Sequence, residues 1–136
     1  MSSLLFVDTW FWVATLNPRD AWHDFARGEA QRRFDDRLVT SEEVLSEVLA
    51  YFAEGGAFLR EVATTAVRGM FRSPLIEVER QSHASFLAGL ELYEQRLDKG
   101  YSLVDCVSMV TMRRLGITEV LTGDRHFAQE GFITLF

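Results

Sequence analysis

The stretch Leu4-Leu5-Phe6-Val7-Asp8 consists of four consecutive apolar residues followed by an acid. An apolar run without polar alternation is typical of a strand that is buried on both faces, and such strands are usually parallel. In open parallel sheets, ligands bind at the carboxyl ends of the strands. The stretch therefore predicts a parallel strand in the interior, with Asp8 at the edge of the sheet where binding sites form.

The rest of the chain alternates short apolar runs with segments of helical periodicity. Further strands are expected at residues 37–40, 75–79, 119–122 and 132–135. Helices are expected at residues 9–16, 20–34, 57–71, 82–97, 102–115 and 124–129, and another from a Thr40–Glu43 capping box to Gly55. This alternation predicts an α/β fold of three layers, α/β/α, with a central, mostly parallel sheet of about four to five strands. We expect one domain over residues 1–136.

Length and composition limit the class of protein. A chain of 136 residues with 48% hydrophobic and 25% charged side chains suits one soluble globular domain that needs no disulfide or structural metal. No apolar run approaches the roughly 20 residues that span a bilayer, and the N-terminus lacks the basic and long apolar regions of a secretory signal. We therefore expect a cytoplasmic protein that is not bound to a membrane. The single cysteine, Cys106, excludes an internal disulfide and a cysteine-built metal centre.

The charge balance excludes a strongly basic protein that coats nucleic acid, because 14 basic and 20 acidic residues give a net charge of −6. All the basic residues except Lys99 are arginines, whose forked donors suit phosphate oxygens. The candidates for phosphate contact are Arg27, Arg32, Arg33, Arg113, Arg114 and Arg125, although an ordinary solvated charge is the expectation for each of them singly. The net charge does not exclude a local basic groove around an acidic centre that binds metal ions.

Two acids follow predicted strands. Asp8 ends the first strand, and Asp124 follows the fourth strand after one glycine. If these strands are neighbours, both carboxylates lie at the same edge of the sheet. The alternative for each is a helix N-cap, because Asp is a preferred cap and both precede helical segments.

Two further acids lie near the starts of helices with apolar faces, Glu47 one full turn inside its helix and Asp105 in the first turn. Glu47 adjoins an apolar stripe, and its neighbour one turn earlier is another acid, Glu43. A carboxylate near the core needs a partner, either an arginine from another element or a divalent metal. Asp105 has capping-box spacing with Ser102, but its helix is almost entirely apolar. The roles of cap and metal ligand are compatible for Asp105.

Asp8, Glu47, Asp105 and Asp124 come from four separate segments and can meet only through folding. Their mutual repulsion would raise some of their pKa values unless a dication were bound. Carboxylate oxygens with water select Mg²⁺ or Mn²⁺, and such a site keeps positions open for a phosphate and an attacking water. The constellation is typical of metal-assisted phosphodiester cleavage.

The motifs that support a family resemblance are Phe6-Val7-Asp8-Thr9, Trp12-Val13-Ala14, Asp20 with His23, Thr40-Ser41 with Glu47, Ser102-Leu103-Val104-Asp105-Cys106, Leu121-Thr122-Gly123-Asp124-Arg125-His126-Phe127 and Gly131-Phe132. With them, the chain resembles a PIN-domain ribonuclease, specifically the toxin subunit of the VapBC type of toxin–antitoxin pair. The resemblance covers nearly the whole chain. It implies an α/β/α fold and an endoribonuclease that depends on Mg²⁺ or Mn²⁺.

The resemblance also assigns residues. It implies that the acids Asp8, Glu47, Asp105 and Asp124 are both the catalytic residues and the metal ligands, with Thr9, Ser102 and Thr122 as auxiliary residues. Thr9 could instead satisfy an amide at a helix start, and Thr122 could be an ordinary strand residue. Some PIN domains carry one more acid just after the fourth, where this chain has Arg125-His126. Occupancy of a second metal site is therefore open.

Family members commonly form homodimers and are silenced by an antitoxin protein whose tail covers the active groove. One short helical region carries several large aromatic residues, Trp10, Phe11, Trp12 and Trp22. Together they provide more apolar area than such a region usually buries, so part of this area could lie at a protein interface. At least two of these side chains are expected in the core. His126 could contact a substrate phosphate, but we expect a solvated helix residue. The alternative function is a catalytically silent PIN-like module that binds RNA or a protein partner.

Overall fold

The computed structural model describes residues 4–33 and 35–136. Its sheet has five strands in the order β3-β2-β1-β4-β5, and every neighbouring pair is parallel. The strands are β1 (Leu4–Val7), β2 (Arg37–Ser41), β3 (Ile76–Glu79), β4 (Glu119–Leu121) and β5 (Ile133–Thr134). The predicted parallel sheet of four to five strands is confirmed. The strand predicted from the apolar run, β1, lies at its centre.

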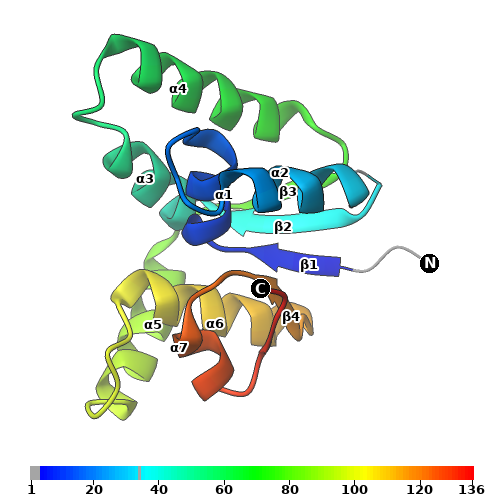
Figure 1. The fold of residues 1–136 in the computed structure, drawn as a ribbon. Coiled ribbons are helices and arrows are strands. Elements are labelled where there is room, and N and C mark those ends of the chain that lie inside the picture. The colour runs from blue at the N-terminus through cyan, green and yellow to red at the C-terminus, as the bar shows by residue number, and fades with distance from the viewer. Residues whose placement is uncertain (1–3, 34) are drawn as a thin grey trace.

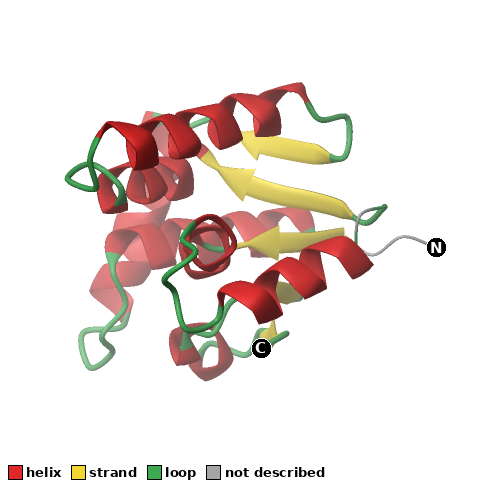
Figure 2. Cartoon of the chain, turned by 45° about the horizontal axis from the view of Figure 1, so that its top comes forward, coloured by secondary structure: helices red, strands yellow, loops and turns green. Residues whose placement is uncertain are grey.

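Helices connect the strands. They are α1 (Thr9–Leu16), α2 (His23–Arg32), α3 (Glu42–Tyr51), α4 (Ala57–Arg72), α5 (His83–Gln95), α6 (Leu103–Leu115) and α7 (Arg125–Gln129). Figure 1 traces this alternation from β1, near the N-terminus, to α7, near the C-terminus. Helices cover the sheet on both sides (Figure 2), so the predicted α/β/α architecture is confirmed. No helix within the described residues is both long enough and apolar enough to cross a membrane.

The central position of β1 brings the ends of β1 and β4 together. Phe6 is paired with Val39 of β2 on one side and with Val120 of β4 on the other. Beyond the last paired residues, the backbone N–H of Asp8 donates to the Leu121 carbonyl oxygen at 3.3 Å. The residues that follow the two strands therefore begin at the same edge of the sheet, as the sequence predicts.

The core lies on both faces of β1. Leu5, Phe6 and Val7 are completely buried, as the continuous apolar run predicts. Helix α6 is buried on most of its surface too, including Cys106 and the uncharged polar residues Ser108 and Thr111. The sequence predicts both the buried α6 and the buried cysteine.

Two predicted helix starts are wrong. Helix α3 is capped by Ser41, whose Oγ accepts a hydrogen bond from the Val44 backbone N–H at 3.2 Å, and not by Thr40. Strand β2 continues through Thr40, whose hydroxyl donates to the Val7 carbonyl oxygen at 3.1 Å. Helix α2 begins at His23 and not at Asp20, because the Asp20 carboxylate accepts a hydrogen bond from the Trp22 N–H and forms a turn. The expected end of that helix, residue 34, lies outside the described residues.

Helices α5 and α6 pack closely at Gly89. This glycine is buried, and a Cβ added there would lie 2.4 Å from Cγ2 of Val107. We expect Gly89→Ala to lower the free energy of unfolding by about 1–3 kcal/mol, because the two helices would have to separate. Urea denaturation measures the change.

Gly69 provides the matched control. It lies inside α4, and an added Cβ would meet no described atom outside its own helix within 4 Å. Gly69→Ala should therefore raise the free energy of unfolding by about 0.5–1 kcal/mol through helix propensity alone. A Gly89→Ala variant as stable as the wild type would show that the helices are not in close contact at this point.

Candidate functional site

A cleft of about 660 Å³ lies at the carboxyl ends of β1 and β4. Its lining includes all four predicted acids, Asp8, Glu47, Asp105 and Asp124, together with Thr9, Ser102 and His126. The acids come from the end of β1, from α3, from α6 and from the turn before α7. The structure therefore brings the four acids to one cleft.

Asp8 is almost completely buried at the base of the cleft. Its Oδ2 accepts a hydrogen bond from the Thr122 hydroxyl at 2.9 Å. Burial raises the pKa of Asp8 to about 7, the Thr122 hydrogen bond opposes this, and the nearby charges of Asp105 and Asp124 raise the pKa further. Within the part of the chain that the structure describes, its side chain makes no capping bond to α1, so the N-cap alternative does not explain this acid.

Asp124 does cap a helix. Its Oδ1 accepts a hydrogen bond from the His126 backbone N–H at 2.9 Å, at the start of α7. The Asp124 N–H in turn donates to the Thr122 hydroxyl at 3.0 Å. The single hydroxyl of Thr122 therefore connects Asp8 with the turn that carries Asp124.

Glu47 contacts the cleft from α3. Its Oε1 accepts a short hydrogen bond, 2.5 Å, from the Thr9 hydroxyl. Burial raises the pKa of Glu47, the Thr9 hydrogen bond opposes the rise, and the charges of Asp105 and Asp124 add to it. None of the ion pairs formed by residues 4–33 and 35–136 involves Glu47, so the arginine partner weighed from the sequence is not observed.

Asp105 forms the predicted capping box with Ser102. The Ser102 hydroxyl accepts from the Asp105 N–H at 3.0 Å, and Asp105 Oδ2 accepts from the Ser102 N–H at 3.0 Å. Asp105 is nevertheless buried, and burial raises the pKa of its carboxyl group, with the Ser102 hydrogen bond opposing. Asp105 is thus both a helix cap and an acid of the cleft.

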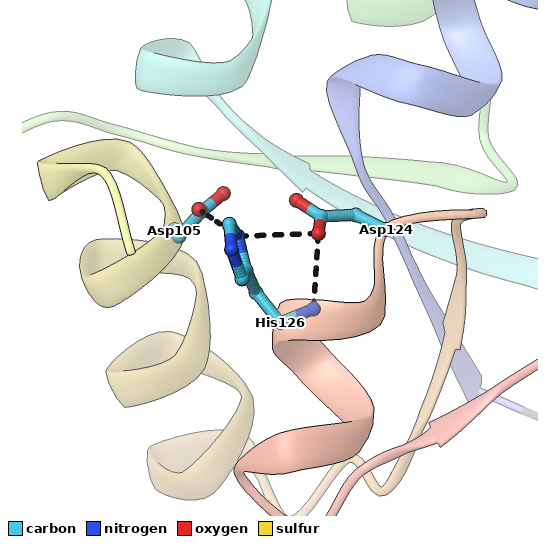
Figure 3. Close-up of side chains that lie close together, drawn as sticks. All are labelled: Asp105, Asp124 and His126. Carbon is cyan, nitrogen blue, oxygen red and sulfur yellow. Dashed lines mark hydrogen bonds and ion pairs between the residues drawn. The ribbon is translucent and has the colours of Figure 1, made fainter. Parts of the chain in front are cut away.

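His126 is the cleft residue that the sequence analysis underrated. Its Nδ1 lies 3.3 Å from Asp105 Oδ2 and 3.2 Å from Asp124 Oδ1 (Figure 3), in contrast to the expected solvated helix residue. The available signal was its spacing, because the second residue of a helix lies beside the N-cap residue, here Asp124.

The donor atoms fit a divalent cation. One ligand atom each of Asp105, Asp124 and His126 lies within 4.8 Å of the other two. Asp8 and Glu47, in the same cleft, have carboxyl groups with raised pKa values, which a bound cation would lower again. Carboxylate oxygens and imidazole nitrogen are ordinary ligands of divalent metals in proteins. The cluster could therefore hold a metal ion.

Most of the arginines that we considered for phosphate contact are engaged elsewhere. Arg32 and Arg33 pair with Glu29, Arg113 pairs with Glu130, and Arg114 pairs with Glu79. Of the six candidates, Arg125 lines the cleft. Arg125 is therefore the phosphate candidate that the structure favours.

A second cluster that the sequence did not predict anchors the end of α7. The buried carboxylate of Glu130 accepts hydrogen bonds from Arg96, Arg113 and the Tyr101 hydroxyl. The Arg96 hydrogen bond is the main cause that lowers the pKa of Glu130 to about 2. No local spacing reveals this cluster, because its members come from distant segments. It holds α7 in place behind Asp124 and His126.

The aromatic residues near α1 divide as expected. Phe11 and Trp12 are buried in the core, while Trp22 is 51% exposed. Trp10 lines the cleft, and its ring packs against the backbone of Gly123, where an added Cβ would lie only 2.6 Å from the ring. The turn between β4 and Asp124 therefore requires a glycine at this position.

Replacing Asp8 tests the electrostatic strain in the cleft. Because the pKa of Asp8 is about 7 in the folded protein and 3.8 as the ordinary value, the folded chain keeps this proton to a higher pH than the unfolded chain. Stability of the metal-free protein should therefore fall as the pH rises from about 4 to about 7. In EDTA, Asp8→Asn should be more stable than the wild type by a margin that grows over this interval and is constant above it.

Thermal denaturation at pH 5 and pH 8 measures this difference in stability. The control is Asp24→Asn, at an exposed acid, for which the difference from the wild type should not grow between these pH values. A large loss of stability in Asp8→Asn at both pH values would instead make Asp8 a structural hydrogen-bond acceptor.

Comparison with known proteins gives the family. The PIN domain profile matches residues 5–132. The 23S rRNA-specific endonuclease VapC20 of Mycobacterium tuberculosis is 30% identical over 133 residues, which cover 96% of each chain. A VapC ribonuclease of Aquifex aeolicus is 27% identical over 100 residues, covering 74% of this chain and 70% of that protein.

A solved structure supports the same family. The crystal structure of Mycobacterium tuberculosis VapC20, described as a sarcin–ricin loop cleaving toxin, superposes with a TM-score of 0.82 at 29% identity and covers 96% of this chain and 97% of that one. The profile match, the relatives and the shared fold lead to one conclusion: this chain belongs to the PIN-domain family.

Proposed function

We propose that the chain is an endoribonuclease, the toxin of a VapBC-type toxin–antitoxin pair, which hydrolyses RNA phosphodiester bonds with the help of Mg²⁺ or Mn²⁺. The observation that carries this proposal is the meeting of four acids in one cleft at the end of β1 and β4. The names of the relatives, a 23S rRNA-specific endonuclease and a VapC ribonuclease, support it. In this proposal the chain acts as one PIN domain over residues 1–136.

The contacts support the following catalytic roles. Asp8, Glu47, Asp105 and Asp124 are the catalytic acids and hold the cation. When bound, a divalent cation supplies positive charge that polarises the scissile phosphate, promotes ionisation of the attacking water and stabilises the leaving oxygen. Asp105 is oriented for this by the Ser102 amide, and Asp124 by the amide of His126.

The auxiliary hydroxyls orient the other two acids. The Thr122 hydroxyl donates to Asp8 and fixes the direction of its carboxylate deep in the cleft. The Thr9 hydroxyl holds Oε1 of Glu47, which leaves Oε2 to accept a hydrogen bond from the attacking water. Arg125, on the rim of the cleft, contacts a phosphate of the substrate.

The partners that we propose are an RNA substrate and a cognate antitoxin protein, with a homodimer as the form of the toxin, in the cytoplasm. Trp22 and Phe25 support an additional interface, because they expose about half of their side chains next to each other on α2 and the turn before it. The net charge of −6 predicts RNA binding of modest affinity that is sensitive to salt.

The test is cleavage of purified total RNA with Mg²⁺, with Mn²⁺ and with EDTA. We expect discrete fragments that require the metal. Asp124→Asn should lower the rate by at least about a hundredfold, the scale of losing one group that stabilises charge in a transition state. Asn is as good a helix cap as Asp, so α7 should remain folded in this variant.

Asp24→Asn, on the exposed side of α2, should cleave like the wild type. RNA binding in a gel shift without any cleavage would contradict the proposal and favour the catalytically silent module. Cleavage that persists in EDTA and in Asp124→Asn would show that the four acids do not perform the reaction.

A further inference from the structure

The His126 side chain is held in one place by its surroundings. Its ring contacts the Tyr101 ring edge-on, with 5.4 Å between centroids. Gly100, the neighbour of Tyr101 in the chain, also lies close, because a Cβ added there would be 3.4 Å from Nε2. The imidazole therefore fits between the α5–α6 loop and α7, and its Nδ1 is directed at the two aspartates (Figure 3).

Nδ1 itself is unsatisfied. The atom is buried, and within the described residues it has no hydrogen-bond partner, although carboxylate oxygens of Asp105 and Asp124 lie 3.3 and 3.2 Å away. A protonated imidazole that served as an ion-pair partner would direct its N–H along one of these contacts, and neither contact has that alignment. The arrangement instead leaves one nitrogen and two carboxylate oxygens within 4.8 Å of one another, with the nitrogen unpartnered.

A nitrogen in this position changes which cation the site prefers. Carboxylates and water suit Mg²⁺ and Mn²⁺, whereas imidazole nitrogen suits transition metals, whose affinities rise from Mn²⁺ through Co²⁺ to Ni²⁺. Exchange of an oxygen ligand for a nitrogen ligand therefore favours transition metals at the expense of Mg²⁺.

We propose that Nδ1 of His126 is a ligand of the divalent cation that Asp105 and Asp124 hold, and that it makes the site prefer transition-metal ions to Mg²⁺. This inference rests on the proposed function, because the cation is that of the nuclease site. It gives His126, two residues after Asp124, a specific role in this chain, that of selecting the metal.

The experiment measures metal binding directly, without RNA. Pulsed electron paramagnetic resonance of the Mn²⁺-loaded protein detects a nitrogen ligand through its hyperfine coupling. Calorimetric titrations give the affinities for Co²⁺ and Mg²⁺. Two variants change the proposed ligand. His126→Asp replaces the imidazole by a carboxylate, and His126→Asn leaves neither an imidazole nor a carboxylate at this position. The control is His83→Asn, at an exposed histidine that begins α5.

We expect nitrogen coupling in the wild type and in His83→Asn, and none in either His126 variant. The ratio of Co²⁺ to Mg²⁺ affinity should fall at least about tenfold in His126→Asp, with Mg²⁺ affinity kept or increased.

Bound Mn²⁺ without nitrogen coupling in the wild type would overturn the inference. So would unchanged metal affinities in both His126 variants together with weaker RNA binding, because His126 would then contact the substrate phosphate. In either case, metal-dependent RNA cleavage by the wild type would leave the proposed function standing. A wild-type protein that neither binds a cation nor cleaves RNA would overturn both.

Discussion

The burial of several carboxylates, close enough to repel one another, at one end of a parallel sheet is the constraint on which the site depends. β1 lies at the centre of the sheet, so the acid that follows it is buried beneath those that follow β4 and begin α6. Burial and neighbouring negative charges raise the pKa values of Asp8, Glu47 and Asp105. The fold thus stores an electrostatic cost in the cleft that a divalent cation would remove, and this links the architecture to metal-dependent chemistry.

Hydrogen bonds to each of the four acids set the orientation of its carboxylate in the cleft. Thr122 holds Asp8, Thr9 holds Glu47, and backbone amides hold Asp105 and Asp124. Each acid therefore has a set orientation, and none of the lysine or arginine ion pairs formed by residues 4–33 and 35–136 involves any of the four. Farther from the cleft, the Glu130 cluster fixes the end of α7. Charge is compensated there by arginines, so that α7 can carry Asp124 into an acidic environment.

The sequence predicted the layers, the parallel sheet and the four acids, because these depend on local patterns: apolar runs, helical spacing, and acids directly after strands. It placed the cap of α3 one residue early, at Thr40, because Thr40 and Glu43 have capping-box spacing, whereas in the structure Thr40 belongs to the strand that pairs with β3 and Ser41 is the cap. The contact of His126 with Asp105 and the contact of Glu130 with Arg96 join distant segments. No spacing along the chain encodes such contacts, and only the folded structure reveals them.

A crystal soaked in Mn²⁺ and measured at the manganese absorption edge tests the central claim most directly. If the four acids form a cation site, the anomalous difference map will show a strong peak in the cleft, about 2.2 Å from carboxylate oxygens of at least two of them. Millimolar Mn²⁺ with no peak between the acids, and carboxylates in the positions described above, would contradict the account. The cleft would then be an acidic surface and not a metal centre.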